Sequence, residues 1–399
     1  MTVAAISGRR HAPGQLAMAP AQPGLNKILV VTLLLVATGL LMMTSASIEI
    51  AASLHGDPFY YLKRQGTFAI MGFAAMLLTM LIPVQVWRKN STWLLVVSYL
   101  LLVLVLIPGV GKTVNGSTRW IDLGFVRLQA SELVKIFMVI FLAAYLEKNQ
   151  DLVRESWRGF IEPLLAVAGT VVLLHFEPDH GAMVIIMATA FALLFLAGAR
   201  LYRFILMLLG CSVGIAAIAV MKPYVLQRFS SFMNPWSAEN VYGGGYQLTQ
   251  ALIAFGRGEW SGVGLGNSIQ KLYFLPEAHN DFVLAIIGEE LGIVGVAWVI
   301  LLLSALVYLA LSVGFRAQSV GRHFYAYFAF GLGILFAGQA LINIGVNTGL
   351  LPTKGLTLPF LSYGGASLIV CCFMIGLLLR LDYEVSCESG LGQGGKRGG

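Results

Sequence analysis

The sequence predicts an all-α integral membrane protein with about ten transmembrane helices. Hydrophobic residues make up 58% of the 399 residues and charged residues only 11%, whereas a soluble domain carries roughly 25% charged residues. Apolar runs of about 20 residues, the length that crosses a bilayer, recur along the chain, and residues 28–47 form the first. This composition excludes a soluble globular enzyme.

The chain divides into a membrane domain, residues 27–384, and two cytoplasmic tails, residues 1–26 and 385–399. The first tail is polar and lacks the small-residue cleavage site of a signal peptide, so we expect the first span to be retained. The expected spans are residues 27–47, 66–83, 92–108, 132–146, 160–176, 181–198, 201–220, 281–313, 323–343 and 363–381.

The positive-inside rule orients these spans with both termini in the cytoplasm. An even number of spans puts both tails on one side, and more Lys and Arg residues flank the spans when that side is the cytoplasm. The net charge of +7 is then matched by anionic membrane lipids, and no nucleic acid partner is needed. The four cysteines have no spacing typical of a disulfide framework or a metal site.

The longest outside segment, residues 221–280 between helices 7 and 8, differs in composition from the rest of the chain. Its many glycines permit tight turns and close approach to a ligand. Apolar residues recur at helical spacing over residues 246–258, which predicts a short helix along the membrane surface. An ordinary solvated loop is the alternative, but loops longer than about 15 residues are usually functional or disordered. The aromatic residues here favour a functional loop.

Carboxylates cluster where this loop enters the eighth span. Asp281 lies at the outer mouth of the span, while Glu289 and Glu290 lie about 12 Å deeper at 1.5 Å per residue. Neighbouring residues face different sides of a helix, and a carboxylate within a membrane needs a partner. We therefore expect Glu289 and Glu290 to hold helices together. Asp281 is better placed for chemistry on an amphiphilic ligand.

A second outside loop joins spans three and four and brings Arg119 beside an interfacial aromatic residue, Trp120. Residues 119–129 alternate in polarity, which favours a small hairpin across either the turn at Asn115–Gly116 or the one at Gly124. Glu132 and Lys135, three residues apart, share a helix face and can pair. An ion pair that merely anchors the helix is the alternative. Ionisable residues within a span cost about 2.5–3.5 kcal/mol and tend to be functional, which favours a functional Lys135.

Five stretches of the chain, taken in order, carry a resemblance: NGSTRWIDLG, QASELVKI, GGGYQLTQALIAFGRGEWSGVGLGNSIQKLYFLPEAHNDF, IGEELG and GLLPTKGLTLPFLSYGGAS. Together they resemble the SEDS family (shape, elongation, division and sporulation) of bacterial membrane proteins. The resemblance covers residues 27–384, and Lys354 in the last stretch resembles the division branch. The loop EPDHG departs from the family's usual QPDLG at Glu177 and His180, so its role stays open.

The resemblance implies the SEDS fold and a peptidoglycan glycosyltransferase that polymerises lipid II into a growing glycan strand. It places the protein in the bacterial cytoplasmic membrane at the division septum. The expected partners are a single-span class B penicillin-binding transpeptidase and other divisome proteins. It also implies that Asp281 is the catalytic acidic residue, although Asn280 stands where Thr is commoner in the family.

The residues fit that chemistry. The acceptor hydroxyl must lose its proton as it attacks the anomeric carbon, and a carboxylate such as Asp281 can take it. The charge on the leaving pyrophosphate must be met by cations or by a divalent metal, magnesium or manganese, for which the sequence identifies no ligands. The candidate pyrophosphate-binding residues are Arg119, Glu132, Lys135, Arg228, Lys271 and Lys354. The candidate supporting residues are Trp120, Gln247, Glu277, His279, Glu289 and Glu290.

Two other functions compete with the enzyme. A lipid II flippase would also have ten spans and buried carboxylates, but it needs a polar path to the inside face. The inside loops are short and basic, and the unusual polar residues gather outside, which favours the enzyme. A non-catalytic scaffold that recruits a transpeptidase is the third reading, and such a scaffold would still support division after Asp281→Ala.

Overall fold

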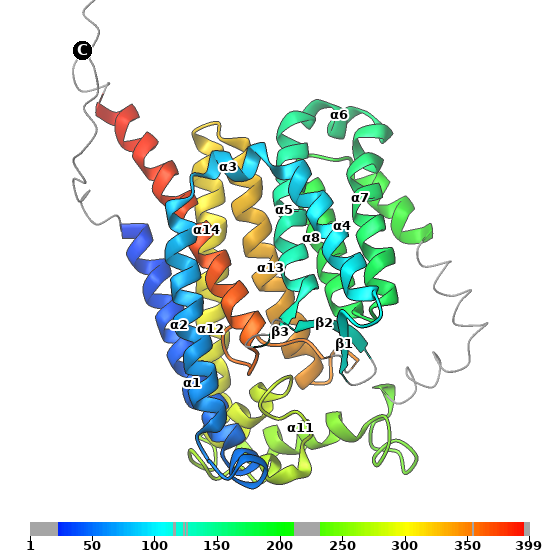
Figure 1. Ribbon diagram of the computed structural model, residues 1–399, viewed down its shortest axis with the longest axis vertical. Helices are drawn as coiled ribbons and strands as arrows, with labels where there is room; N and C mark the ends of the chain where they lie inside the picture. The colour runs from blue at the N-terminus through cyan, green and yellow to red at the C-terminus, as the bar shows by residue number, and fades with distance from the viewer. Residues whose placement is uncertain are drawn as a thin grey trace, which may run out of the picture.

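The computed structural model describes residues 23–114, 117–122, 124, 127–210, 232–352 and 355–394. The long helices run side by side as a bundle (Figure 1). The three strands, the helix α11 (Tyr246–Gly258) and the start of α12 (Val283–Ser319) lie at one end of this bundle, and the short helices α3 (Val84–Lys89) and α6 (Gln150–Glu155) lie at the other. The helices are α1 (Pro23–His55), α2 (Tyr60–Leu81), α3 (Val84–Lys89), α4 (Ser91–Leu106), α5 (Ala130–Lys148), α6 (Gln150–Glu155), α7 (Trp157–Phe176), α8 (His180–Leu196), α11 (Tyr246–Gly258), α12 (Val283–Ser319), α13 (His323–Asn347) and α14 (Gly365–Gly394), with a π-helical turn, η1 (Gln270–Phe274).

Six helices in the described ranges are long and apolar enough to cross a membrane: α1, α2, α7, α12, α13 and α14. Shorter apolar helices are α4, α8 and Leu201–Gly210, and α5 carries charged residues at both ends. Each expected span overlaps one of these helices, and the seventh continues into residues outside the described ranges. The chain is thus a mostly helical multi-pass membrane protein. The count of ten crossings and the cytoplasmic position of both tails stay predictions.

Close packing in the bundle depends on small residues where helices α2 and α14 meet. A Cβ on Gly376 would lie 2.5 Å from the Met76 carbonyl oxygen, and a Cβ on Gly72 would lie 2.9 Å from the Cys372 sulfur. Because lipid gives no hydrophobic drive for helix association, such close approach is a main source of attraction between membrane helices. Helix α13 occupies the middle of the bundle, where it contacts α5, α8, α12 and α14.

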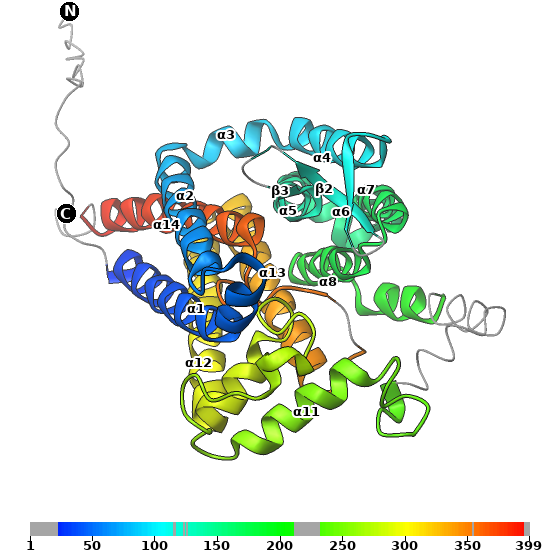
Figure 2. The same ribbon diagram turned by 60° about the horizontal axis from the view of Figure 1, so that its bottom comes forward.

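The loop between α4 and α5 folds into a three-stranded antiparallel sheet in the order β1 (Gly111–Val114), β2 (Ser117–Asp122) and β3 (Arg127–Gln129). The pairing of β2 with β3 confirms the predicted hairpin, with Trp120 opposite Gln129. Strand β3 leads directly into α5 at Ala130. Seen from this end, α13 lies between the strands on one side and α11 on the other (Figure 2).

Helix α12 departs from the continuous span expected over residues 281–313, because it breaks at Gly292, where φ is 64°. The segment before α12 replaces the missing helical hydrogen bonds. Val263 and Gly264 donate their backbone N–H groups to the carbonyls of Glu289 and Glu290, and Ile293 donates to Glu259. Irregular backbone at membrane depth is tolerated only where protein or water satisfies it. The loop after α11 is therefore part of the bundle. At the other end of the chain, α14 continues to Gly394, past the expected start of the tail at residue 385.

Candidate functional site

Asp281 lies at the end of the bundle that carries the strands and α11, immediately before Phe282, the N-cap residue of α12. Two side chains of α13 hold its backbone, since the amides of Asn343 and Asn347 each donate to the Asp281 carbonyl at 2.9 Å. Its carboxylate faces the loop before α14, where a Cβ on Gly355 would lie 2.7 Å from Oδ2. The side chain is half-buried, so it is enclosed by protein and still reachable.

This enclosure sets the protonation of Asp281. The pKa of its carboxyl is raised to about 7, mainly by burial and also by the charge of Glu277, while the charge of Arg119 acts in the opposite direction. Removing a carboxylate from water disfavours its charged form. A carboxyl that titrates near neutral pH is suited to accept a proton in a reaction and to release it afterwards.

Arg119 reaches the same region from β2. Its Nη2 donates to Ser117 at 2.8 Å, and its Nη1 lies 3.7 Å from Asp179 Oδ1. The other oxygen of Asp179 accepts from Ser131 at 2.7 Å and from Gln129 at 2.9 Å. The loop between α7 and α8 is thereby tied to the start of α5. The guanidinium keeps only a loose ion pair and part of its surface is exposed, so it can meet an anionic ligand.

Glu132 and Lys135 form the expected pair on the first turns of α5, with Lys135 Nζ 2.8 Å from Glu132 Oε1. Both side chains are almost fully buried, at 6% and 3% exposed. Glu132 Oε2 accepts no hydrogen bond within the described part of the chain. A buried ion pair with unused hydrogen-bonding capacity costs free energy, which favours a functional role over simple anchoring.

Glu177, the position where the loop EPDHG departs from the family pattern, is fully buried. Neither of its carboxylate oxygens has a hydrogen-bond partner among the described residues. The pKa of this carboxyl is raised to about 8, mainly by burial and also by the nearby charge of Asp179, while the charge of Arg119 lowers it. Glu177 is therefore protonated at neutral pH, which removes the cost of burying its charge.

Aromatic rings surround the residues just before Asp281. His279 is buried, and its ring centroid lies 5.0 Å from that of Tyr61 and 5.7 Å from that of Tyr363. The Tyr363 N–H donates to the His279 carbonyl at 2.9 Å. Burial lowers the pKa of His279, which keeps the ring neutral. Glu277 is half-buried and accepts from the side chain of Asn280.

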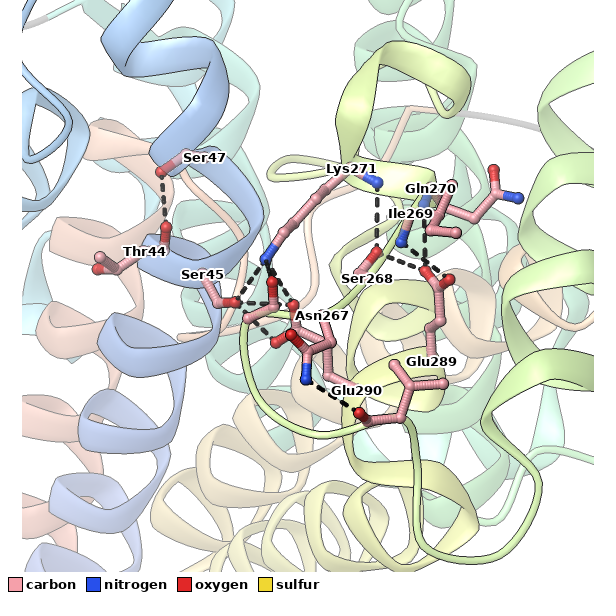
Figure 3. Close-up of polar contacts among 12 residues, drawn as sticks. Thr44, Ser45, Ser47, Asn267, Ser268, Ile269, Gln270, Lys271, Glu289 and Glu290 are labelled. Carbon is pink, nitrogen blue, oxygen red and sulfur yellow. Dashed lines mark hydrogen bonds and ion pairs between the residues drawn. The ribbon is translucent and has the colours of Figure 1, made fainter.

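Lys271 and the two carboxylates of α12 form one buried network (Figure 3). Lys271 Nζ lies 2.8 Å from Glu290 Oε1, and it also donates to the Gly266 carbonyl at 2.7 Å. Ser45 of α1 donates to both oxygens of Glu290, at 2.8 and 2.7 Å. Because Lys271 is 4% exposed and its donors are engaged, it supports the loop and is not free to bind a phosphate.

Glu289 completes the same network and is fully enclosed. Its Oε1 accepts from Arg257 at 2.7 Å and from the Ile269 N–H at 3.1 Å, and its Oε2 accepts from Ser268 and from the Gln270 N–H. Glu290 thus contacts α1 through Ser45, and Glu289 contacts α11 through Arg257. These contacts fit the expectation that the two carboxylates hold helices together, and that role stays a prediction.

The remaining candidate residues are more peripheral or lie outside the described ranges. Trp120 is half-buried on β2, and Gln247 is half-buried on α11. Arg228 and Lys354 lie outside the residues that the structure describes. Within the described ranges, no group of three or more His, Cys, Asp or Glu side chains could hold a metal ion.

Sequence reasoning missed Asn343, Asn347 and Gly355, although each borders Asp281. Asn343 is the last residue of the expected span 323–343, and Asn347 follows that span. Their spacing was an available signal, since two amides four residues apart share one face of a helix and rarely occur in apolar spans without a partner. The contact of Gly355 with Asp281 joins segments far apart in the chain, and no local pattern reports it.

Comparison with known proteins places the chain among its relatives. The family model described as "Cell cycle protein", which covers FtsW, RodA and SpoVE, matches residues 26–387. The "Probable peptidoglycan glycosyltransferase FtsW" of Hahella chejuensis is 50% identical over 352 residues, which are 88% of each chain. The protein of the same description from Thioalkalivibrio sulfidiphilus is 46% identical over 390 residues, covering 98% of this chain and 97% of that protein.

Solved structures agree with the sequence matches. A chain from the structure described as "Structural coordination of polymerization and crosslinking by a peptidoglycan synthase complex" superposes with a TM-score of 0.74 at 25% identity, covering 90% of this chain and 97% of that chain. The Rod shape determining protein RodA of Thermus thermophilus superposes with a TM-score of 0.64 at 25% identity, covering 90% and 96%. The chain therefore belongs to the SEDS family of FtsW, RodA and SpoVE cell cycle proteins and shares their fold.

Proposed function

We propose that the protein is a peptidoglycan glycosyltransferase that polymerises lipid II at the outer face of the cytoplasmic membrane during septal wall synthesis. The observation that carries the proposal is the setting of Asp281. It is a half-buried carboxyl whose pKa is raised to about 7, held at the mouth of a membrane bundle beside a partly exposed arginine. Relatives that match along nearly the whole chain are described as probable peptidoglycan glycosyltransferases.

The proposed reaction is a single displacement. The acceptor sugar hydroxyl attacks the anomeric carbon of the donor, the bond from that carbon to the pyrophosphate oxygen breaks, and the hydroxyl proton passes to Asp281. One displacement inverts the anomeric centre, so an α-linked pyrophosphate donor gives a β-linked glycan. Asp281 then returns its proton to water, which a carboxyl that titrates near pH 7 does readily.

The negative charge that develops on the pyrophosphate needs positive charge near Asp281. Arg119 is the best placed of the candidate cations for this role. Its charge lowers the pKa of Asp281, and its own ion pair with Asp179 is loose. Lys135 lies on the first turns of α5, one turn after Ser131, which hydrogen-bonds Asp179, and its Nζ pairs with Glu132. A magnesium or manganese ion could neutralise the same charge. Such an ion would be held mainly by substrate phosphates, with one or two carboxylates from the protein.

We also propose that a class B penicillin-binding transpeptidase is the partner. The solved relative with a TM-score of 0.74 comes from a peptidoglycan synthase complex in which polymerization and crosslinking are coordinated. A polymerase that hands nascent strands to a crosslinking enzyme fits that description. Localisation at the division septum rests on the FtsW relatives.

The test is polymerisation of purified lipid II by the protein in liposomes with its transpeptidase partner present. We expect wild type to make glycan, and Asp281→Ala and Asp281→Asn to make none while keeping their fold and partner binding. Asp57→Asn is the matched control, because Asp57 is a solvent-accessible carboxylate just before α2 that pairs with Lys63 and accepts the Phe59 N–H. Undiminished polymerisation by both Asp281 variants would overturn the assignment of the base. Lipid II transport across the bilayer without polymerisation would support the flippase.

A further inference from the structure

The two asparagines of α13 lie at the centre of the inference, which rests on the proposed function. Asn343 and Asn347 are one helical turn apart and are almost fully buried, at 1% and 0% exposed. Both donate an amide N–H to the Asp281 carbonyl at 2.9 Å. One backbone carbonyl therefore receives two side-chain donors from a neighbouring helix.

Asn343 also links the segment that carries Asp281 to the loop before α14 that faces it. Its amide nitrogen donates to the Leu356 carbonyl at 2.6 Å as well as to the Asp281 carbonyl. Leu356 follows Gly355, the residue whose backbone lies against the Asp281 carboxylate. A single amide group thus sets the separation between the segment that carries the carboxylate and the loop that faces it.

Asn347 fixes the other side of Asp281. Its Oδ1 accepts the N–H of Ala285 in the first turn of α12 at 3.2 Å, while its amide nitrogen also donates to Asn343 at 2.9 Å. The Ala285 N–H also donates to the Phe282 carbonyl at 3.0 Å, so Asn347 provides a second acceptor, from α13, at the start of α12. Asp281 and the start of α12 are consequently held to α13 as one unit.

We propose that Asn343 and Asn347 are positioning residues that hold Asp281 in its enclosed, reactive placement. They do not touch the substrate in this account. They act through the backbone of Asp281, in the way that supporting hydrogen bonds hold reacting groups within about 0.5 Å of productive geometry. A displacement of about 1 Å can lower a rate by roughly 100-fold.

The proposal can be tested by measuring how the protonation of Asp281 changes with pH, which depends on the charged groups that face it. Among the described residues, Glu277 of its own segment and Arg119 of β2 act on it. Helix α13 presents only the two amides at this place, and the loop before α14 presents the backbone of Gly355 and Leu356. If the amides are removed, Asp281 gains freedom to move toward water, and its titration moves toward that of an ordinary aspartate.

The variants are Asn343→Leu and Asn347→Leu, which remove the donors and keep similar side-chain bulk. Asn343→Ser is added in case the leucines prevent folding, because a serine hydroxyl can donate to the carbonyl one turn earlier on its own helix. Thr348→Val is the matched control. Thr348 is a polar residue at the same end of α13, and its hydroxyl bonds only carbonyls of its own helix.

Two measurements are made on each variant with the full chain in liposomes. The first is lipid II polymerisation with its pH profile. We expect kcat to fall about tenfold or more in the Asn343 and Asn347 variants, KM for lipid II to change less than about twofold, and the acid limb of the profile to move to lower pH. Thr348→Val is expected to match wild type in kcat, in KM for lipid II and in the position of the acid limb.

The second measurement does not need activity. Dicyclohexylcarbodiimide adds to a protonated carboxyl to give an O-acylisourea, which rearranges to a stable N-acylurea that mass spectrometry locates. We expect labelling of Asp281 in wild type to disappear as the pH rises through about 7, and in the asparagine variants to disappear at lower pH. Folded variants with an unmoved labelling midpoint and an unmoved acid limb would overturn the proposal. A wild type that labels normally but makes no glycan would instead count against the proposed function.

Discussion

The backbone of Gly355 lies so close to Asp281 that a Cβ placed on Gly355 would be 2.7 Å from the carboxylate oxygen Oδ2. A real Cβ does not approach an oxygen so closely, so any side chain at residue 355 must displace either the carboxylate or the loop. The site therefore requires glycine at this position for space.

Gly355→Ala is expected to lower lipid II polymerisation by about 10- to 100-fold, because the methyl group would push Asp281 from its position. The measurement is the rate of glycan formation together with the melting temperature of the purified protein. Gly364→Ala in the same loop is the control, since a Cβ there would make ordinary contacts at 3.5 Å or more. Equal activity of both variants would mean that the carboxylate tolerates the shift and that its placement is not critical.

The pH dependence of lipid II polymerisation should change when either of the two charged residues around Asp281, Arg119 or Glu277, is replaced. A base must be ionised to accept a proton, so activity should fall as the pH drops through about 7, the raised pKa of this carboxyl. Arg119→Gln removes the charge that lowers this pKa and should move the acid limb to higher pH, whereas Glu277→Gln should move it to lower pH. Shifts in the same direction for both variants would contradict the proposed electrostatics.

The network of Lys271 and Glu290 makes a prediction about stability. Removing one partner of a buried ion pair leaves an uncompensated charge and costs about 3–5 kcal/mol. Lys271→Met should therefore lower the melting temperature strongly, and the double variant Lys271→Met/Glu290→Gln should recover most of the loss.

Polymerisation by the same double variant separates the two roles considered for Lys271. If Lys271 only supports the loop, activity should recover along with stability. A stable but inactive double variant would return Lys271 to the pyrophosphate site.

Glu177 should make stability depend on pH. Its folded-state pKa is raised to about 8 from an ordinary value of 4.5, so the folded state keeps a proton that the unfolded chain releases. Its contribution to stability is complete below about pH 4.5 and is lost as the pH rises through about 8. Glu177→Gln removes this dependence, and at pH 8.5 it should exceed wild type by about 1–2 kcal/mol after allowance for solvent screening. Parallel melting curves for the two proteins from pH 5 to 8.5 would argue against a protonated Glu177.

Local patterns in the sequence predicted the local features of the site. The pair of Glu132 and Lys135 follows from a spacing of three residues on one helix, and the β2–β3 hairpin follows from alternation. The need of Glu289 and Glu290 for partners follows from the cost of charge in an apolar span.

Contacts between distant segments were beyond such patterns. Ser45 is 245 residues away from Glu290, and Asn343 is 62 residues away from the Asp281 carbonyl that it binds. The break at Gly292 was missed for a related reason. A glycine inside an apolar run is compatible with a continuous helix. The hydrogen bonds that stabilise the break come from the backbone of Glu259, Val263 and Gly264, in the segment before α12.

The break in α12 also separates the part of the helix that can span the membrane from the part that lies next to Asp281. The part of α12 after the break, Ile293–Ser319, is about 40 Å long at 1.5 Å per residue, which exceeds the roughly 30 Å of a bilayer's hydrocarbon core. That part can cross the membrane by itself. The part before the break, Val283–Leu291, adds about 13 Å of helix. Asp281 lies just before the start of this part. In the proposed reaction the base is therefore carried next to the short part of α12, whose direction is set at the Gly292 break, and not by the part that can span the membrane.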